Sequence, residues 1–346
     1  MLTGRRNNMN KQYFISICIP SYNRPKELAR LLESIDTKQV SKVQIVICED
    51  KAPQRLEVRG VVEAYSRHSK FNVKYIENSE NFGHGKNLRE CIKQADGEYV
   101  LFMGDDDMFI PEEFDEYFVF LSNHSECGYI LRSSRQLVSN GKYEYFRYYP
   151  NDRVFSPGIE SYTQLFLKSV FMSGFTIKRD LVVEYFIDSL DDTLLFQLYL
   201  MAEVCMKHAS AYYNTPFVQG VGDGISYFGV NDKEKGLYTP GVLVTNNRNF
   251  IDGFLKITNY VDKKYNINST EIIKTEMSKY SYSFMWVARS MGRKKFKEHC
   301  QGLREMGLDN THYFDIYYYG LYIFGETITK NMILLIKKVL GRRVIL

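Results

Sequence analysis

The first hundred residues alternate between two hydrophobic patterns, and this alternation restricts the possible folds more than any other feature of the sequence. Short apolar runs rich in Val, Ile and aromatic residues predict strands at 13–19, 43–48, 72–76 and 99–103. Between the strands, apolar residues recur at helical spacing and predict helices, the first of which begins at Pro25. Strands that alternate with helices are typical of βαβ units. The sequence therefore predicts an α/β fold in which a mostly parallel sheet carries helices on both faces.

The rest of the chain divides into two parts with different patterns. Residues 111–225 mix helical and extended patterns, whereas residues 226–346 are mainly helical. A chain of 346 residues with 45% hydrophobic content is long enough to bury a core in each part. We therefore expect a flexible N-terminal tail at 1–12, an α/β domain at 13–225 made of the halves 13–110 and 111–225, and a helical C-terminal region at 226–346.

The composition excludes several classes of protein. A formal net charge of +4 is too small to indicate nucleic acid binding over a broad surface. The six cysteines are far apart and form no CxxC pair, which predicts buried thiols in a reducing compartment rather than disulfides or a zinc site. Residues 1–12 are polar and basic, unlike a signal peptide, and no apolar run approaches the roughly 18 residues of a membrane span. We therefore expect a cytoplasmic protein that does not bind nucleic acid.

An acidic triplet, Asp105-Asp106-Asp107, stands just after the predicted strand 99–103. Open α/β sheets bind their ligands at the carboxyl ends of strands. Three adjacent carboxylates repel one another unless a cation compensates them, and hard divalent cations bind such oxygen ligands together with phosphate groups. The triplet thus indicates a divalent metal that carries phosphate oxygens. The alternative is a solvated turn in which an Asp caps the helix that follows Pro111.

Four segments are similar to motifs of the family-2 glycosyltransferases of the GT-A fold. They are the opening strand and loop (17–24), the second strand with its acidic end (45–50), the Asn-x-Gly segment (81–87) and the run into the acidic triplet (95–107). The family usually has Asp-x-Asp-Asp at the triplet, whereas this chain has Gly104 at the first acidic position. The Gly-x-Asp-Asp version resembles the abequosyltransferase-like branch, which builds bacterial surface polysaccharide.

The resemblance implies an inverting glycosyltransferase that takes a sugar from a nucleotide-sugar donor and adds it to a cell-surface polysaccharide or a polyprenyl-linked oligosaccharide. A Mn²⁺ or Mg²⁺ ion would stabilise the leaving diphosphate as a Lewis acid. The matching positions assign the metal to Asp106 and Asp107 and place Asp105 with the donor. Asp223 falls where many relatives carry a histidine that completes the metal site, although a tight Gly-Asp-Gly turn explains it equally well.

The resemblance also implies a donor-binding crevice whose side chains come from three loops: Pro20, Ser21, Tyr22, Asp50, Asn81 and Lys86. The first three would wall the nucleotide base, Asp50 would accept a hydrogen bond from the base, and Lys86 would compensate phosphate charge. Simpler roles remain open for several of them. Tyr22 could serve packing alone, Asp50 could be a turn residue and Lys86 a solvated helix residue.

An inverting transfer needs a general base that deprotonates the acceptor hydroxyl. The family's base is an Asp or Glu in the second half of the domain, just before an amphipathic helix, and Asp191 and Asp192 match this position. Both residues could equally be the N-cap and first turn of the helix that runs to Met201. The segment Ser173-Gly174-Phe175 resembles the small-residue segment under the acceptor sugar.

The C-terminal segment 330–346 has the pattern of a basic amphipathic helix. Apolar residues fall on one face, lysines lie opposite them, and Arg342 and Arg343 follow. Such a helix can lie on the anionic cytoplasmic face of the inner membrane, where a polyprenyl-linked acceptor would be found, or it can dock on the body of the protein.

Two other functions fit the sequence less well. A catalytically inactive GT-A subunit, acting as a binding or scaffold component of a polysaccharide assembly complex, is the alternative if Gly104 has removed metal binding. A nucleotidyltransferase would share the α/β nucleotide fold and the acidic metal site. It would usually show a Gly-rich, basic phosphate loop near its N-terminus, and residues 20–24 do not form one.

Overall fold

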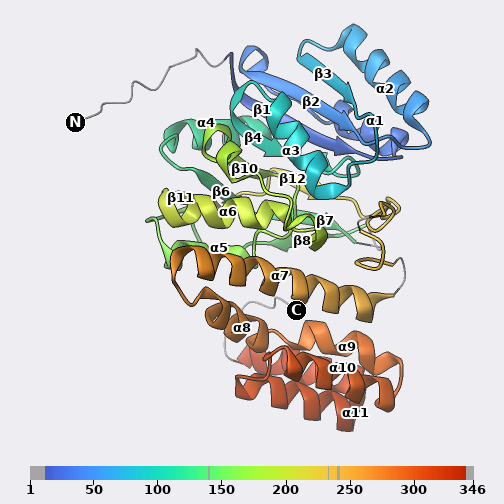
Figure 1. Cartoon of the computed structure of the whole chain (residues 1–346), viewed down its shortest axis with the longest axis vertical. Helices are drawn as coiled ribbons and strands as arrows, with labels where there is room; N and C mark the ends of the chain where they lie inside the picture. The colour runs from blue at the N-terminus through green and yellow to red at the C-terminus, as the bar shows by residue number, and fades with distance from the viewer. Residues whose placement is uncertain (1–11, 139–140, 233, 240–241, 340–346) are drawn as a thin grey trace. The chain divides into compact units, whose positions relative to one another are not determined.

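The computed structural model describes residues 12–138, 141–232, 234–239 and 242–339. The chain divides into two compact units, residues 1–233 and 234–346 (Figure 1). The domain boundary expected at 225 therefore falls inside the first unit.

The first unit is built on an eight-stranded sheet with the strand order β3-β2-β1-β4-β10-β6-β11-β9. The four predicted strands run parallel in its first half: β1 (Tyr13–Ser21), β2 (Val43–Glu49), β3 (Asn72–Glu77) and β4 (Gly97–Phe102). The second half contains β10 (Phe175–Lys178), β6 (Tyr129–Arg132), β11 (Ser210–Tyr213) and β9 (Arg153–Phe155). Because β10 runs antiparallel between β4 and β6, it separates two parallel groups of strands. The predicted α/β fold with a mostly parallel sheet is confirmed.

Helices cover both faces of this sheet. They are α1 (Pro25–Glu33), α2 (Arg55–His68), α3 (His84–Gln94), α4 (Glu113–Asn123), α5 (Ile159–Phe166) and α6 (Phe196–Lys207). Successive side chains of a strand point to opposite faces, and β1 illustrates the result. Ile17 and Ile19 belong to the core that includes α1 and α4, whereas the Cys18 thiol donates to the Cys91 carbonyl of α3 at 3.6 Å. All six cysteines are buried free thiols, as the sequence predicted.

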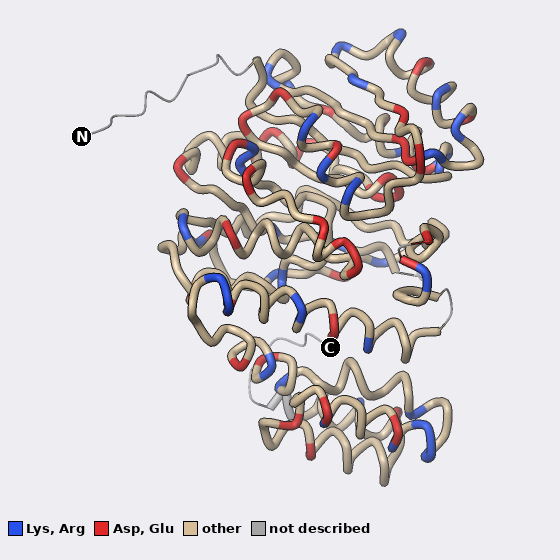
Figure 2. The backbone as a smooth tube through the Cα atoms, viewed as in Figure 1, with Lys and Arg blue, Asp and Glu red and all other residues tan. Residues whose placement is uncertain are grey.

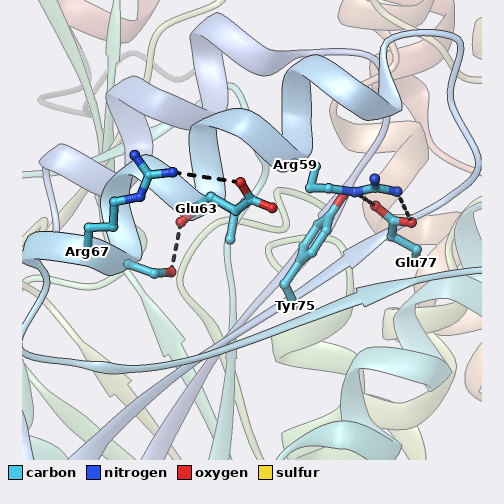
Figure 3. A pocket seen from close by; sticks show the side chains of 7 residues that line it. Arg59, Glu63, Arg67, Tyr75 and Glu77 are labelled. Carbon is cyan, nitrogen blue, oxygen red and sulfur yellow. Dashed lines mark hydrogen bonds and ion pairs between the residues drawn. The ribbon is translucent and has the colours of Figure 1, made fainter.

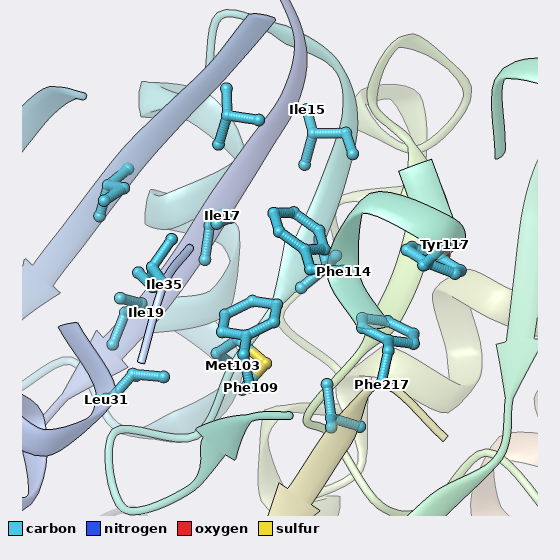
Figure 4. Packing of buried hydrophobic residues seen from close by; sticks show 14 of the residues in the cluster. Ile15, Ile17, Ile19, Leu31, Ile35, Met103, Phe109, Phe114, Tyr117 and Phe217 are labelled. Atoms are coloured by element: carbon cyan, nitrogen blue, oxygen red, sulfur yellow. The ribbon is translucent and has the colours of Figure 1, made fainter. Parts of the chain in front are cut away.

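The main core lies between β1, β2, β4 and the helices α1 and α4 (Figure 4). Its aromatic part includes Phe109, Phe114, Tyr117 and Phe217, and the rings of Tyr117 and Phe217 stack 3.9 Å apart. Burial of each such side chain stabilises the fold by about 2 kcal/mol. Because Met103 and Phe109 belong to this core, the acidic triplet between them is anchored on both sides.

A second, four-stranded sheet positions the chain on the carboxyl side of the triplet. Its order is β5-β12-β7-β8, with β5 (Met108–Phe109), β12 (Val218–Gly220), β7 (Ser134–Leu137) and β8 (Tyr143–Phe146). β5 follows the triplet directly and pairs with β12, so that Val218 lies opposite Phe109. This pairing brings the segment after Gly220 beside the triplet, although about a hundred residues separate them in the sequence.

The second unit is helical, as predicted. It contains α7 (Leu243–Tyr265), α8 (Ser269–Lys279), α9 (Tyr282–Ser290), α10 (Arg293–Glu305) and α11 (His312–Val339), which is kinked at Gly325. Tyr280 and Ser281 separate α8 from α9. Among the described residues, no helix is long and apolar enough to cross a membrane.

Candidate active site

The parallel register of β1, β2 and β4 gathers the sequence-predicted site residues at one edge of the sheet. Ser21 pairs with Glu49, and Cys18 pairs with Phe102, so the three strands end close together. The loop after β1, Asp50 after β2 and the acidic triplet after β4 therefore share this edge. It is the position at which open α/β sheets bind ligands.

Asp105 is buried and ties the triplet to the loop after β1. One of its oxygens accepts the Tyr22 backbone N–H at 3.0 Å, and the other accepts the Arg24 guanidinium at 2.6 Å. Asn23, between these two donors, has a φ of 60°, which Asn tolerates better than most residues. Burial raises the pKa of Asp105 to about 6, although Arg24 opposes this rise. Asp105 is thus an internal anchor of the site.

Asp107 is also buried, and it faces the second half of the domain. It accepts the hydroxyl of Ser173, whose oxygen also accepts the Gly104 N–H at 2.9 Å. Arg132, which is fully buried, donates through Nε to the Ser173 carbonyl at 2.7 Å. Burial raises the pKa of Asp107 to about 7. The network connects the triplet to β6 through the segment that was expected under the acceptor sugar.

Asp106 is the member of the triplet whose carboxylate reaches solvent. Its side chain is 24% exposed, and the nearer Arg24 nitrogen is 3.2 Å from its Oδ2. The Asp106 backbone carbonyl accepts a hydrogen bond from Arg30 at 2.6 Å. Asp106 is therefore the carboxylate of the triplet best placed to meet a ligand.

Gly104, at the family's first acidic position, has close surroundings. A Cβ at residue 104 would lie 3.1 Å from Asp106 Oδ1 and 3.2 Å from both Asp107 Oδ2 and Ser173 Oγ. These distances are shorter than ordinary van der Waals contacts. A side chain at this position would therefore require Asp106, Asp107 or Ser173 to shift slightly.

Asp223 comes to the same edge but is paired with an arginine. Its two carboxylate oxygens accept hydrogen bonds from Arg30 at 2.6 and 2.9 Å. Arg30 holds the pKa of Asp223 below its usual range. Because Arg30 also binds the Asp106 carbonyl, it connects Asp223 to the triplet. Asp223 as a metal ligand stays a prediction.

Asp50 organises the loop between β3 and α3. Its Oδ1 accepts the Phe82 N–H and the Asn78 amide, both at 2.8 Å, and its Oδ2 accepts the Gly83 N–H at 2.9 Å. Burial raises the pKa of Asp50, and these hydrogen bonds oppose the rise. No motif in the sequence marks Asn78, which also donates to Asn87 at 2.9 Å. The predicted contact of Asp50 with a nucleotide base stays a prediction.

The other predicted donor-site residues line the same edge. The ring of Tyr22 meets Tyr227 edge to face at a centroid distance of 5.5 Å. Asn81 accepts hydrogen bonds from Asn231 at 2.7 and 3.0 Å. The Lys86 ammonium lies 3.9 Å from the centre of the Phe82 ring and 3.6 Å from Glu80. Pro20 is partly buried and Ser21 fully buried at the end of β1.

Asp191 and Asp192 begin a short 3-10 helix, η4 (Asp191–Thr193), beside the start of α3. Both oxygens of Asp191 accept hydrogen bonds from Arg89, a nearly buried residue of α3, which also donates to the Ile187 carbonyl at 2.7 Å. Asp192 is exposed. A Cβ at Gly85 would lie 2.9 Å from Asp191 Oδ1, so η4 contacts the first turn of α3. No motif in the sequence marks Arg89. Its position among the apolar residues of α3 is nevertheless a sign that this charged residue lies on the buried face of the helix.

The residues of the triplet suit a divalent cation that arrives with phosphate. Carboxylate oxygens are the ligands that Mg²⁺ and Mn²⁺ prefer, and Mg²⁺ is usually bound by one or two carboxylates together with substrate phosphates and water. Asp106 supplies one such carboxylate, and it already has a guanidinium cation beside it. Within the described part of the chain, no group of three or more acidic, His or Cys side chains is placed to hold a metal by itself. The donor set therefore fits a metal shared with a diphosphate.

A separate pocket lies between α2 and β3 (Figure 3). Arg59 forms an ion pair with Glu77 at 2.7 Å, and Arg67 lies 4.0 Å from Glu63. Since its arginines already have acidic partners, this pocket offers little uncompensated charge to an ionic ligand.

The fold is that of an α/β domain of the GT-A type, with the acidic triplet at the carboxyl ends of its parallel strands. Residues 16–176 match the family model described as Glycosyl transferase family 2. The chain therefore carries a glycosyl transferase family 2 domain, as the sequence motifs indicated.

The curated relatives match this domain over part of their length. Abequosyltransferase RfbV of Salmonella typhimurium is 31% identical over 93 residues, which are 27% of this chain and 28% of that protein. The matched segments cover between 28% and 41% of the first three relatives. Less than half of each of these proteins is thus similar to this chain.

Two solved structures resemble the chain over most of its length. Residues 1–349 of Staphylococcus aureus TarS, in complex with UDP-GlcNAc, superpose with a TM-score of 0.53 at 15% identity, over 90% of this chain and 92% of that one. The mannosyltransferase PcManGT of Pyrobaculum calidifontis, in complex with GDP-Man and Mn²⁺, gives a TM-score of 0.52 at 11% identity, over 95% and 88%. At these identities the likeness establishes the fold alone.

Proposed function

We propose that this protein is an inverting, metal-dependent glycosyltransferase that moves a sugar from a nucleotide-sugar donor to a saccharide acceptor. The observation that carries this proposal is the partly exposed Asp106 carboxylate at the carboxyl ends of β1 and β4, the sheet edge at which Tyr22 and Asp50 also lie. Two structural neighbours were solved with a nucleotide sugar, UDP-GlcNAc in one and GDP-Man with Mn²⁺ in the other.

Asp106 would hold the metal, with Asp107 and Asp223 as further candidate ligands. A bound Mn²⁺ or Mg²⁺ ion would supply positive charge that stabilises the leaving diphosphate. Asp105 has a positioning role, since its contacts with Tyr22 and Arg24 fix the triplet relative to the loop after β1. Buried, hydrogen-bonded side chains of this kind hold a site in a fixed geometry.

The donor would lie along the loops after β1 and β3. Tyr22 offers a ring to the nucleotide base, and Pro20 and Ser21 form the wall beneath it. Asp50 fixes the Phe82 and Gly83 backbone, which sets the position of the loop that carries Asn81 and Lys86. The Lys86 ammonium can reach the diphosphate if it leaves the Phe82 ring.

We assign the general base to Asp192 and a positioning role to Asp191. A base must accept a proton from the acceptor hydroxyl. Arg89 already donates hydrogen bonds to both oxygens of Asp191, so this carboxylate is engaged in holding η4 against α3. Asp192 is exposed at the same short helix and can be approached by an acceptor.

The acceptor is proposed from the relatives' names. One relative is an abequosyltransferase, and TarS is named as a poly(ribitol-phosphate) β-N-acetylglucosaminyltransferase. We infer that this chain extends a surface polysaccharide or a polyprenyl-linked oligosaccharide at the cytoplasmic face of the membrane.

Peripheral membrane contact is part of this proposal. Exposed apolar side chains lie on both sides of the kink in α11, each between 46% and 63% exposed: Ile316, Tyr319, Ile323, Ile328, Met332 and Leu335. The second unit contains 18 Lys and Arg residues against 10 Asp and Glu residues, and Figure 2 shows them spread over several of its helices. This positive charge favours an anionic lipid surface and opposes pairing with a second copy of the same face. Residues 340–346 lie outside the described residues.

The experiment that tests the proposed activity measures release of nucleoside diphosphate from a panel of nucleotide sugars, with and without Mn²⁺. We expect turnover that requires Mn²⁺ and that Asp106→Asn abolishes. Asp36→Asn, the same change at an exposed residue after α1, is the control and should leave turnover unchanged. Nucleotide binding without turnover, with saccharide acceptors of both kinds present, would instead favour the inactive binding subunit.

A further inference from the structure

The segment 222–231, here called the strap, lies across the candidate active site. Three polar contacts hold it there. Asp223 binds Arg30 at 2.6 Å, the Ile225 carbonyl accepts Arg24 Nε at 3.0 Å, and Asn231 donates to the Asn81 carbonyl at 2.7 Å. The strap is thus fastened to the loop after β1, to α1 and to the loop before α3.

Aromatic contacts add to this fastening. Tyr227 meets the ring of Tyr22 at 5.5 Å, and the Arg24 guanidinium lies over the Tyr227 ring at the same distance. Phe228 meets the ring of His84 at 5.1 Å. The strap therefore covers Tyr22, which was assigned to the nucleotide base, and His84, the first residue of α3.

Arg24 is the residue at which the strap and the acidic triplet meet. Its guanidinium contacts Asp105 at 2.6 Å, Asp106 at 3.2 Å and the Ile225 carbonyl, and its side chain is 17% exposed. The strap backbone also approaches Asp106 closely, since a Cβ at Gly224 would lie 2.8 Å from Asp106 Oδ2. One cation therefore pairs with two carboxylates of the triplet and holds the strap over it.

A divalent cation on Asp106 would share the carboxylate that Arg24 faces. Two cations that share one carboxylate at this range repel each other, and the repulsion is strong in a partly buried site. Asp105 would keep the Tyr22 N–H if Arg24 turned away, so the triplet does not depend on Arg24 alone. Gly222 and Gly229 have φ values of 69° and 81°, and such glycines can act as hinges at the two ends of the strap.

We propose that Arg24 is an internal cation that competes with the divalent metal for Asp106 and fastens the strap over the site until metal and donor displace it. The inference rests on the proposed function, because it needs the metal to bind at Asp106. Displacement frees the Ile225 carbonyl, which loosens the strap. It also leaves a guanidinium beside the position of the diphosphate. Arg24 is thus a residue that sets metal affinity and access to the site.

The test measures Mn²⁺ binding to the full chain without nucleotide, by titration calorimetry or by the Mn²⁺ electron paramagnetic resonance signal. Arg24→Gln removes the competing charge and should tighten Mn²⁺ binding by about tenfold, within the usual range of coupling between sites. Arg59→Gln is the matched control, because Arg59 also pairs with a carboxylate, Glu77, but lies in the pocket between α2 and β3 (Figure 3). It should leave Mn²⁺ affinity unchanged. If Arg24→Gln binds Mn²⁺ no more tightly than the wild type, Arg24 does not compete with the metal.

A second measurement follows the strap itself. Chymotrypsin cleaves after aromatic residues, and the strap carries Tyr227 and Phe228. Cleavage there should be faster in Arg24→Gln than in the wild type or in Arg59→Gln, all without ligand. Arg24→Lys keeps the charge but not the two-nitrogen contact with Ile225, so it should resemble the wild type in Mn²⁺ affinity and Arg24→Gln in cleavage. If the cleavage rate in both Arg24 variants equals that of the wild type, Arg24 does not hold the strap in place.

A third variant separates the two proposals. Asp106→Asn should lose Mn²⁺ binding if the metal site is correctly assigned. If the wild type and Asp106→Asn bind Mn²⁺ equally, the metal assignment is wrong and the competition falls with it. If Asp106→Asn loses Mn²⁺ but Arg24→Gln gains nothing, the metal site stands and the inference about Arg24 alone is wrong.

Discussion

The three carboxylates of the acidic triplet have different surroundings although they are neighbours in the chain. Asp105 is closed off by Tyr22 and Arg24, and Asp107 by Ser173, so both are buried. Asp106 keeps an oxygen at the surface. A carboxylate that is buried among polar contacts holds the geometry of a site, whereas a partly exposed one can exchange ligands. We therefore expect substitutions at the three positions to have different effects.

Asp107 should make the stability of the metal-free protein depend on pH. Its folded-state pKa of about 7 lies above the ordinary value of 3.8, so the folded protein binds a proton that the unfolded chain releases. Its contribution to the free energy of unfolding therefore rises as pH falls from 8 towards 6, by about 1 kcal/mol. Asp107→Asn removes this dependence and keeps an acceptor for Ser173. Its melting temperature in EDTA should exceed that of the wild type at pH 8, with a smaller excess at pH 6. A constant difference across this range would contradict the raised pKa.

At the scale of elements, Arg89 and Asp191 join α3 to η4. Arg89 is 3% exposed, and Asp191 accepts hydrogen bonds from it with both oxygens. A buried guanidinium that loses its partner is strongly destabilising. The pair thus fixes the short helix that carries Asp192 against the first turn of α3.

This arrangement predicts opposite phenotypes for two neighbouring substitutions. Asp191→Asn should lower the free energy of unfolding by about 2 kcal/mol, because it weakens the hydrogen bonds of the buried Arg89, which keeps Asp188 as a second carboxylate partner at 2.8 Å. Asp192→Asn should change stability by less than about 0.5 kcal/mol but lower kcat by about 100-fold or more, with donor affinity unchanged. Denaturant unfolding and steady-state kinetics measure these effects. If Asp192→Asn keeps full turnover, the base is not Asp192.

The elements that the sequence predicted are those set by local pattern. The strands at 43–48 and 72–76 differ from β2 and β3 by one residue at one end, and Pro25 begins α1 as expected. The reversed strand β10 and the break between α8 and α9 depend on partners distant in sequence. The same holds for the site. Its acidic residues were visible as motifs. The arginines that pair with them, Arg24, Arg30 and Arg89, are distant from them in the sequence, so no local pattern predicts these pairs.

At the scale of the whole molecule, charge is unevenly distributed along the chain. Residues 1–233 contain 27 Lys and Arg residues against 31 Asp and Glu residues, whereas the second unit has an excess of positive charge. The exposed apolar side chains of α11 belong to the positive unit. Apolar side chains combined with positive charge are the features of surfaces that bind anionic membranes.

Co-sedimentation with lipid vesicles tests this surface. The protein should bind vesicles that contain anionic phosphatidylglycerol more strongly than vesicles of phosphatidylcholine alone. The double substitution Ile323→Asp and Leu335→Asp should weaken binding by at least about tenfold, because it removes two apolar contacts and adds repelling charge. Leu56→Asp, at a residue of α2 that is 70% exposed, is the control. Equal binding by the double variant and the control would show that α11 does not contact the membrane.

Metal-coupled nucleotide binding tests the central claim most directly, and thermal denaturation measures it. Nucleoside diphosphates with different bases are added with and without Mn²⁺ to the wild type, Asp106→Asn and Asp36→Asn. At least one nucleotide should raise the melting temperature of the wild type and of Asp36→Asn by about 3 °C or more when Mn²⁺ is present, because ligands stabilise the state they bind. The rise should be absent in Asp106→Asn. If no nucleotide raises the melting temperature, or if Asp106→Asn responds like the wild type, the nucleotide-sugar site is not at the acidic triplet.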